Sequence, residues 1–315
     1  MAEYREIQGA AVQSLASNTG TIEGQIWYDT ANNLFKLQSY QAAGVWSTGG
    51  VLGTARYFAQ NGAGTQNAAL VFGGQAPVKY NTESYDGTAW TEVNDMSRAP
   101  ADTTGMGAGG TQTSALAAGT QPVSTLSESW NGTSWTSTPA LNSGRGYLAG
   151  SIESNTAGIV YGGLGPPTGV ALTELYNGST WSEVADLNTA RRSNAGVGSS
   201  TAALGMGGYS GGNVANCESW DGSCWTTVNS QPIAGGGAAF GTLALAVKKQ
   251  GVNTELWDGT NWSTGTSSSD NISNRSGLGT SSLGLLAGGE PPPGGTTTVE
   301  EYSGPGPVTQ TITTS

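Results

Sequence analysis

A glutamate recurs at one place in a motif that the chain repeats: Glu, one residue, an aromatic, Asn or Asp followed by Gly, and then a Trp. Two copies are "TESYDGTAW" from Thr82 and "TELYNGSTW" from Thr173. Carboxylates can act as acids, bases, nucleophiles or metal ligands, so several in phase could form a ring of reactive or ligand-binding groups. The recurring acids are Glu83, Glu128, Glu174, Glu218, Glu255 and Glu300.

An arginine recurs in phase with these glutamates. It follows the Trp of a preceding copy by eight to thirteen residues in five units, and the unit after Trp225 has none. An unpaired buried carboxylate is costly, so we favour structural Glu–Arg bridges within or between repeats over a ring of substrate-binding arginines. The recurring arginines are Arg56, Arg98, Arg145, Arg191 and Arg275.

The chain contains no histidine, which removes the usual general base and the commonest metal ligand. Glycan hydrolysis by two carboxylates needs a pair roughly 5–9.5 Å apart. The acids outside the repeat, Asp102, Glu153, Asp270 and Glu290, are spread one per loop region. We therefore expect a protein that is not an enzyme, with no catalytic, cofactor-binding or metal-binding residues.

The two cysteines, Cys217 and Cys224, flank one copy of the motif. Alone they cannot complete a tetrahedral metal site. A hairpin across Asp221-Gly222 would bring them close enough for a disulfide to be possible, but two unpaired thiols are the favoured interpretation.

Composition predicts an all-β protein. Only 10% of the 315 residues are charged and 51 are glycine, which suits short strands and tight turns and disfavours long helices. The net charge of −11 leaves no basic surface for phosphates, so nucleic acid is not an expected partner. No apolar run is long enough to span a membrane and no signal peptide is recognisable, so we expect a soluble protein made in the cytosol without membrane insertion.

The tryptophans set the period. Successive copies are 44 to 46 residues apart except for the last, at 37, and such a period is typical of propeller blades. Each unit predicts a small-residue strand, an apolar strand ending in glycines, the Glu strand, a hairpin turn in which Asp/Asn-Gly supplies positive φ angles, and the Trp strand. We expect the tryptophans to fill the core between blades, not to stack on ligands. They are Trp46, Trp90, Trp135, Trp181, Trp225 and Trp262.

Glycine pairs after the apolar strand, in "FGG", "YGG", "MGG" and "AGG", followed by an aromatic and a spaced Trp, resemble the kelch repeat. The resemblance covers about residues 39–303 and implies a β-propeller with four-stranded blades. The sequence departs from the pattern at "LALAVKK", which lacks the double glycine, and at "VEEYSGPGPVTQ", which lacks the Trp.

Counting the strands predicts six blades, closed by pairing the Trp46 strand with the sheet begun at residues 275–302 so that no edge is exposed. The alternative is seven blades, with residues 24–46 as a short blade and "VTQTITTS" as the last strand. We divide the chain into an N-terminal segment at 1–38 with a hairpin of 26–28 and 34–37, a propeller at 39–303, and a C-terminal tail at 304–315.

The segment "GQIWYDTANNLFK" is similar to a short segment near the starts of many phage tail-fibre and other virion proteins. Together with the Gly/Ser/Thr-rich repeats, it resembles repeat proteins encoded by tailed phages of marine bacteria. The resemblance implies a virion structural protein, made in the host cytoplasm and homo-oligomeric in the virion, that contacts other virion proteins through its N-terminal segment. It would be a tail-fibre or adhesin-like component, or else a capsid, neck or tail decoration without receptor binding.

Recognition should use the segments that interrupt the repeat, because the repeated residues serve the architecture. Four such segments fall between the second and third strands of their units, which places them on one face. There they could contact a glycan or protein of the host surface, with plain solvated connectors as an equally weighted alternative. The candidate residues are Pro122, Pro166, Pro167, Tyr209, Pro291, Pro292 and Pro293.

Overall fold

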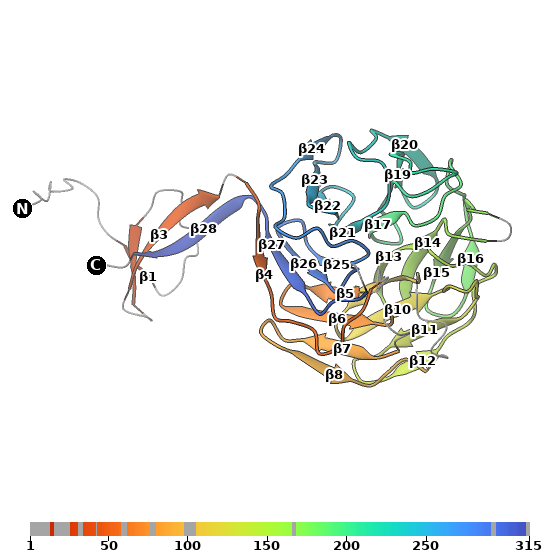
Figure 1. The fold of residues 1–315 in the computed structure, drawn as a ribbon, viewed down its shortest axis with the longest axis horizontal. Helices are drawn as coiled ribbons and strands as arrows, with labels where there is room; N and C mark the ends of the chain where they lie inside the picture. Colours follow the sequence, from red (N-terminus) through yellow and green to blue (C-terminus); the bar gives the residue numbers. More distant parts are fainter. Residues whose placement is uncertain are drawn as a thin grey trace, which may run out of the picture. The chain divides into compact units, whose positions relative to one another are not determined.

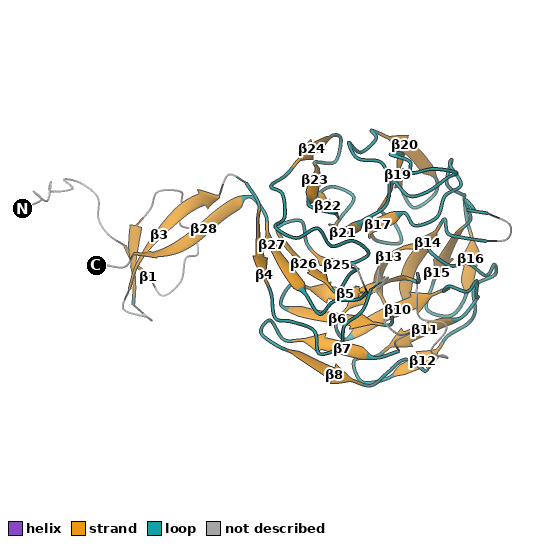
Figure 2. Ribbon diagram, in the orientation of Figure 1, coloured by secondary structure: helices purple, strands orange, loops and turns teal. Residues whose placement is uncertain are grey.

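The computed structural model of the chain is built from strands and loops, and none of the residues that it describes is helical (Figure 2). The prediction of an all-β protein is therefore confirmed. Two compact units are present: residues 1–44 with 304–315, and residues 45–303. The described residues are 13–15, 26–30, 34–41, 43–57, 62–75, 80–97, 105–165, 168–290 and 294–312.

The larger unit consists of six four-stranded antiparallel sheets, the blades of a β-propeller. Blade 1 is β5 (Gly62–Thr65), β6 (Ala68–Phe72), β7 (Thr82–Tyr85) and β8 (Trp90–Val93). Blade 2 is β9 (Gly107–Thr111), β10 (Ser114–Ala118), β11 (Ser127–Trp130) and β12 (Trp135–Ser137). Blade 3 is β13 (Ala149–Ser154), β14 (Ala157–Tyr161), β15 (Thr173–Tyr176) and β16 (Trp181–Glu183).

The other three blades follow the same order. Blade 4 is β17 (Ala195–Gly198), β18 (Ala203–Met206), β19 (Cys217–Trp220) and β20 (Trp225–Val228). Blade 5 is β21 (Ala238–Gly241), β22 (Ala246–Gln250), β23 (Asn253–Trp257) and β24 (Trp262–Thr264). Blade 6 is β25 (Ser276–Gly279), β26 (Leu283–Ala287), β27 (Val299–Ser303) and β4 (Val45–Thr48). In Figure 1 the first strands of the blades surround the centre, and the fourth strands lie at the rim.

Blade 6 closes the ring. Its fourth strand, β4, comes from the N-terminal side of the propeller and pairs antiparallel with β27, with Trp46 opposite Tyr302. Six blades closed by the two ends of the propeller chain are therefore confirmed, and the seven-bladed alternative is wrong. The segment that the alternative used as a blade lies largely in the smaller unit's sheet instead.

Glycine and alanine in the first strands let the blades converge. A Cβ built on Gly150 of β13 would lie 2.7 Å from the backbone nitrogen of Ala108 in β9, and one on Gly277 of β25 would lie 2.6 Å from the carbonyl oxygen of Ala239 in β21. Real side chains do not approach backbone atoms so closely. Small residues are thus required at the positions where the backbones of two first strands approach this closely.

Six apolar clusters fill the spaces between neighbouring blades, one at each interface. Between blades 1 and 2, for example, Phe72 meets Trp135 with ring centroids 4.6 Å apart. Between blades 3 and 4, Tyr161 meets Trp225 at 4.5 Å. The repeat tryptophans are part of the core between blades: Trp135, Trp181 and Trp225 are buried, and Trp46, Trp90 and Trp262 are half-buried.

The turns between third and fourth strands differ in detail from the expectation. At Asp86-Gly87, only the glycine has a positive φ, 93°. The aspartate acts through its side chain, because Oδ1 accepts the N–H groups of Thr88 and Ala89 at 2.8 Å each. Asn131, Asn177, Asp221 and Asp258 make the same two bonds in their turns, so the repeated Asp/Asn is a turn-capping acceptor.

The smaller unit is a four-stranded sheet in the order β1, β2, β3, β28. Its predicted hairpin is present, as β2 (Ile26–Asp29) paired antiparallel with β3 (Leu34–Gln41). Strand β28 (Gly306–Ile312), from the segment assigned to a C-terminal tail, pairs antiparallel with β3. Strand β1 (Gln13–Leu15) pairs parallel with β2.

Candidate functional site

The repeated glutamates are buried, and five of the six form an ion pair with a described cation of their own blade. Glu174 of β15 accepts a bond from the Arg145 guanidinium at 2.8 Å, and both side chains are 0% exposed. The same carboxylate accepts the backbone N–H of Asn142 at 2.8 Å. Burial lowers the pKa of Arg145, and the nearby Glu174 carboxylate opposes that shift. Equivalent pairs join Arg56 to Glu83, Arg191 to Glu218 and Arg275 to Glu300.

Each of these arginines also donates to at least one backbone carbonyl, and three of them donate to two or more. Arg145 donates to the carbonyl oxygens of Gly162 at 3.1 Å and Leu172 at 2.5 Å, at the two ends of the loop between β14 and β15. Glu174 holds the loop that enters blade 3, through Asn142 and Ser143. The pair therefore connects three segments of one blade, and its polar atoms are already engaged.

Blade 5, in which the sequence shows no recurring arginine, has a lysine in its place. Lys248 of β22 lies 2.8 Å from Glu255, with side chains 0% and 2% exposed. It stands where blade 4 has Gly205, since Lys248 is paired with Glu255 as Gly205 is with Glu218. The segment "LALAVKK", which departs from the repeat, thus supplies the missing cation from the second strand. The spacing of the arginines alone did not reveal this replacement.

Blade 6 carries a larger ionic network. Arg275 contacts Asp270 at 2.6 Å and Glu300 at 2.8 Å, and Lys249 from blade 5 lies 3.0 Å from Glu300. Burial raises the pKa of Asp270, but the two cations outweigh it, so the pKa of this carboxyl is lowered below its ordinary value. Two cations and two carboxylates neutralise one another, which favours a structural role.

Glu128 of blade 2 accepts the backbone N–H of Ser97 at 3.1 Å. Its expected partner, Arg98, lies outside the described residues.

The tryptophan indoles connect neighbouring blades. Trp135, Trp225 and Trp46 each donate from Nε1 to a threonine hydroxyl at the start of the preceding blade's third strand: Thr82 at 2.9 Å, Thr173 at 3.1 Å and Thr254 at 3.0 Å. Where that position holds Val299 or Cys217, the indole donates to a backbone carbonyl instead, as Trp90 does to Gly50 and Trp262 to Asn229.

One end of the propeller carries the long loops, and we call it the loop face. It consists of the loops between second and third strands together with the loops that lead into each first strand. The two sets bond to each other from blade to blade: Gly163 of blade 3 donates to the carbonyl of Arg191 at 2.9 Å, and Gly289 of blade 6 donates to that of Arg56 at 2.8 Å. The candidate binding segments therefore share a face.

The double glycine makes this contact possible. Gly162 and Gly163 have φ angles of 65° and 108°, and a Cβ on Gly162 would lie 2.7 Å from the carbonyl oxygen of Arg191. Blade 5 lacks the pair because its second and third strands are joined by a two-residue turn, Gly251-Val252. A pocket of 190 Å³ lies beside that turn, and Asn213, Gln250 and Asn274 contribute to its lining.

One cavity of the loop face lies between the loops of blades 3 and 4. Its volume is 500 Å³, and we call it the blade 3–4 cleft. Of the candidate binding residues, Tyr209 lies in this cleft and is 39% exposed. The side chains that border the cleft belong to Leu164, Thr168, Ala190, Arg192, Tyr209 and Ser210.

Arg192 and Tyr209 form a fixed pair in the cleft. The Arg192 guanidinium lies 4.8 Å from the centroid of the Tyr209 ring, a cation–π contact. Their backbones exchange two hydrogen bonds, of 3.1 and 2.8 Å. The pair could bind an anionic or hydroxyl-rich ligand, because both residues border the cavity.

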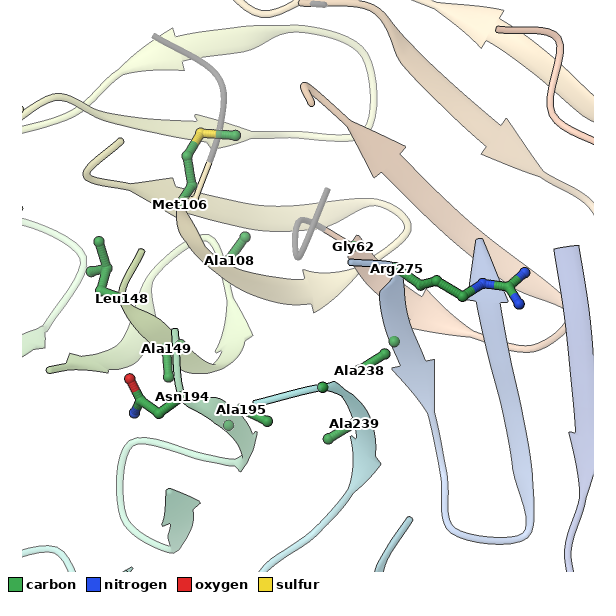
Figure 3. Close-up of a pocket in the computed structure, with 14 residues that line it drawn as sticks. Gly62, Met106, Ala108, Leu148, Ala149, Asn194, Ala195, Ala238, Ala239 and Arg275 are labelled. Atoms are coloured by element: carbon green, nitrogen blue, oxygen red, sulfur yellow. The ribbon is translucent and has the colours of Figure 1, made fainter. Parts of the chain in front are cut away.

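A cavity of 50 Å³ lies among the first strands and is lined mainly by glycines and alanines (Figure 3). Ala108, Ala149, Ala195 and Ala239 surround it in the figure, whereas the Arg275 guanidinium points away from them. A further space of 110 Å³ is bordered by the same six strands. These walls offer backbone and methyl groups, which suits packing more than catalysis.

The remaining residues singled out from the sequence are placed as follows. Pro122 lies in the exposed turn between β10 and β11, whereas Pro166, Pro167, Pro291, Pro292 and Pro293 lie outside the described residues. Cys217 is buried and Cys224 exposed, and both are free thiols, so the disulfide does not form. Arg192 was missed, because in the sequence it is only one half of an adjacent basic pair.

The acids outside the repeat are used individually. Asp270 belongs to the network of blade 6, and Glu290 of the same blade accepts a bond from Asn274 at 2.9 Å. Glu153 accepts the N–H of Ser200 at 2.9 Å, and Asp102 lies outside the described residues. Within the described ranges, no three His, Cys, Asp or Glu side chains are grouped so that they could hold a metal ion. No helix suited to crossing a membrane occurs there either.

Comparison with known proteins shows the fold alone. The solved structure of YjhT, a bacterial protein, is similar with a TM-score of 0.62 at 12% sequence identity. The match covers 79% of this chain and 95% of that chain. No protein-family model matches the sequence. No curated protein matches it either. The six-bladed propeller is thus shared with a protein whose sequence is largely different.

Proposed function

We propose that this protein is a non-enzymatic structural component of a tailed-phage virion, and that its kelch-like propeller presents the loop face to the host surface. The smaller unit, with the "GQIWY" hairpin, would attach it to other virion proteins, and copies of it would assemble there as a homo-oligomer. The similarity of that segment to virion proteins supports the origin, and the double glycines with their spaced tryptophans support the repeat type.

One observation carries the binding role. The repeated charged residues are enclosed within blades and paired, whereas the 500 Å³ cleft of the loop face is bordered by side chains that the repeat does not share. Loops on a rigid ring are the usual place for recognition. Binding is therefore expected at the cleft, with the repeat as its support.

The experiment is a loop replacement. Residues 164–171 are exchanged for a short Gly-Ser linker, and attachment of the fluorescently labelled protein to a panel of marine bacteria is measured with its melting temperature. We expect attachment to be lost while melting is unchanged. The matched control replaces residues 199–202, the turn between β17 and β18, and should retain attachment.

Two outcomes would decide against host binding. If the unaltered protein attaches to no strain but binds virions that lack it, the protein is a capsid, neck or tail decoration. If attachment survives the loop replacement and is lost when residues 1–38 are removed, the working surface belongs to the N-terminal segment.

A further inference from the structure

Arg192 differs from the other cations of the propeller. Seven lysines and arginines are described in residues 45–303, and six of them lie within 3.0 Å of a carboxylate. Arg192 is the one for which the described residues provide no ion pair. In a chain with twice as many acids as bases, 22 against 11, a guanidinium left without a carboxylate is unexpected on charge alone.

The repeat does not explain this residue. Matching backbone bridges identify the equivalent positions in three other blades. The position of Arg192 is held there by Tyr57, Gly146 and Ser273, and that of Tyr209 by Gln75, Leu164 and Glu290. The stacked pair therefore occurs only in blade 4 among these four. The backbone bridge is common to all of them and needs neither side chain.

We propose that the blade 3–4 cleft binds the carboxylate of an acidic sugar unit in a surface glycan, with Arg192 as the residue that contacts the carboxylate. That the ligand comes from a host surface rests on the proposed function. That the ligand carries a carboxylate rests on the residues of the cleft. The guanidinium of Arg192 lies over the Tyr209 ring, and no described residue accepts a hydrogen bond from it, so its N–H groups can donate two parallel bonds to a carboxylate.

The lining favours a sugar over an acidic peptide. Thr168 and Ser210 offer hydroxyl groups and Gly169 and Gly211 leave backbone accessible, while Leu164 is the one large aliphatic side chain among the described lining residues. A peptide interface usually needs apolar anchors in deep pockets, which these residues do not supply. The exposed part of the Tyr209 ring offers a surface for a sugar ring.

Charge favours a ligand with isolated carboxylates. The net charge of −11 repels a dense polyanion as a whole, so attraction is local to Arg192. Two backbone hydrogen bonds between Arg192 and Tyr209 already fix their positions, and Ser210 donates to Gly212 at 2.9 Å within the loop. Little ordering is then required on binding.

The test compares two disaccharides that differ at one group: cellobiouronic acid, with a carboxylate, and cellobiose, with a hydroxymethyl group. Titration calorimetry on the full chain should give roughly ten- to hundredfold tighter binding of the acid, the range for hydrogen bonds to a charged group. Arg192→Gln should abolish that preference, and Arg192→Lys should restore only part of it. Lys36→Gln, which changes the net charge equally in the smaller unit, should keep it.

Equal binding of the two sugars, absence of binding by both, or a preference that survives Arg192→Gln would each overturn the assignment. Melting temperatures verify that the variants fold. Attachment to bacteria, measured in parallel, separates the two proposals. Uronate binding without attachment to any strain leaves the site standing and removes the host role, whereas attachment without any preference for the uronate leaves the host role and removes the site.

Discussion

At the scale of single residues, the repeat glutamates link segments of a blade through buried ion pairs. Glu174→Gln should reduce the free energy of unfolding by about 3–5 kcal/mol, because the buried Arg145 guanidinium loses its counter-charge. Glu183 lies directly opposite Glu174 on the next strand but is exposed, so Glu183→Gln should change little. Denaturant unfolding of both variants, and of Glu174→Gln combined with Arg145→Met, measures the coupling. Additive effects would contradict a structural pair.

A second residue-scale prediction comes from an indole without a partner. Trp181 Nε1 and Ser127 Oγ are both buried and unbonded, although the equivalent atoms in three other interfaces bond to each other through a threonine. Ser127→Thr should therefore stabilise the protein by about 1 kcal/mol, because its hydroxyl is held toward the indole. Ser127→Val supplies the same volume without the hydroxyl. If both variants gain equally, packing and not the hydrogen bond is responsible.

Acid should weaken blade 6 through Asp270. Its pKa is lowered in the folded protein from the ordinary 3.8, since Arg275 and Lys249 outweigh burial. A carboxyl with a lowered folded pKa contributes stability above its unfolded pKa and loses it as the pH falls through the folded value. The free-energy difference between the protein and Asp270→Asn should thus be constant near neutral pH and shrink below 3.8. Unfolding curves that keep the same difference in strong acid would exclude this role.

At the scale of strands, crowding at the centre determines which glycines can be replaced. Gly150→Ala should cost about 1–3 kcal/mol, because its Cβ would lie 2.7 Å from the Ala108 backbone nitrogen. Gly212→Ala is the matched control, since no atom lies within 4 Å of the corresponding Cβ. Thermal unfolding compares the two. A Gly150 variant as stable as the control would mean that neighbouring first strands can separate.

Strand order and blade number could be predicted from the sequence because each strand repeats with the period of the tryptophans. The ion pair of Lys248 could not be predicted in this way. The arginines of the other blades precede the first strand, whereas Lys248 lies on the second strand and still places its charge beside Glu255. The cleft could be predicted only in part. Tyr209 stood out as an interruption of the repeat, but Arg192 meets it through a backbone pairing across 17 residues that no period marks. Contacts between loops that do not repeat depend on tertiary packing, and the spacing of residues along the sequence does not predict them.

At the scale of the whole molecule, closure depends on a four-residue strand. Strand β4 pairs with β27, and Trp46 from it donates to Thr254 of blade 5 at 3.0 Å. Lys249 of blade 5 lies 5.9 Å from the centroid of the Trp46 ring and 3.0 Å from Glu300 of blade 6. The last interface thus contains an apolar cluster, an indole bond and an ion pair that crosses from one blade to the next. These contacts hold β4, which the chain does not join directly to β27, against blade 5.

Two truncations isolate this closure. Residues 45–303 retain β4 and should fold as a stable monomer, because the smaller unit contributes no strand to any blade. Residues 49–303 lack β4, so they expose the edge of β27 and leave the space of Trp46 empty, which should cause aggregation or a large fall in melting temperature. Light scattering and calorimetry compare the pair. If the shorter chain is equally stable and monomeric, the five remaining interfaces suffice and the terminal strand is not what closes the propeller.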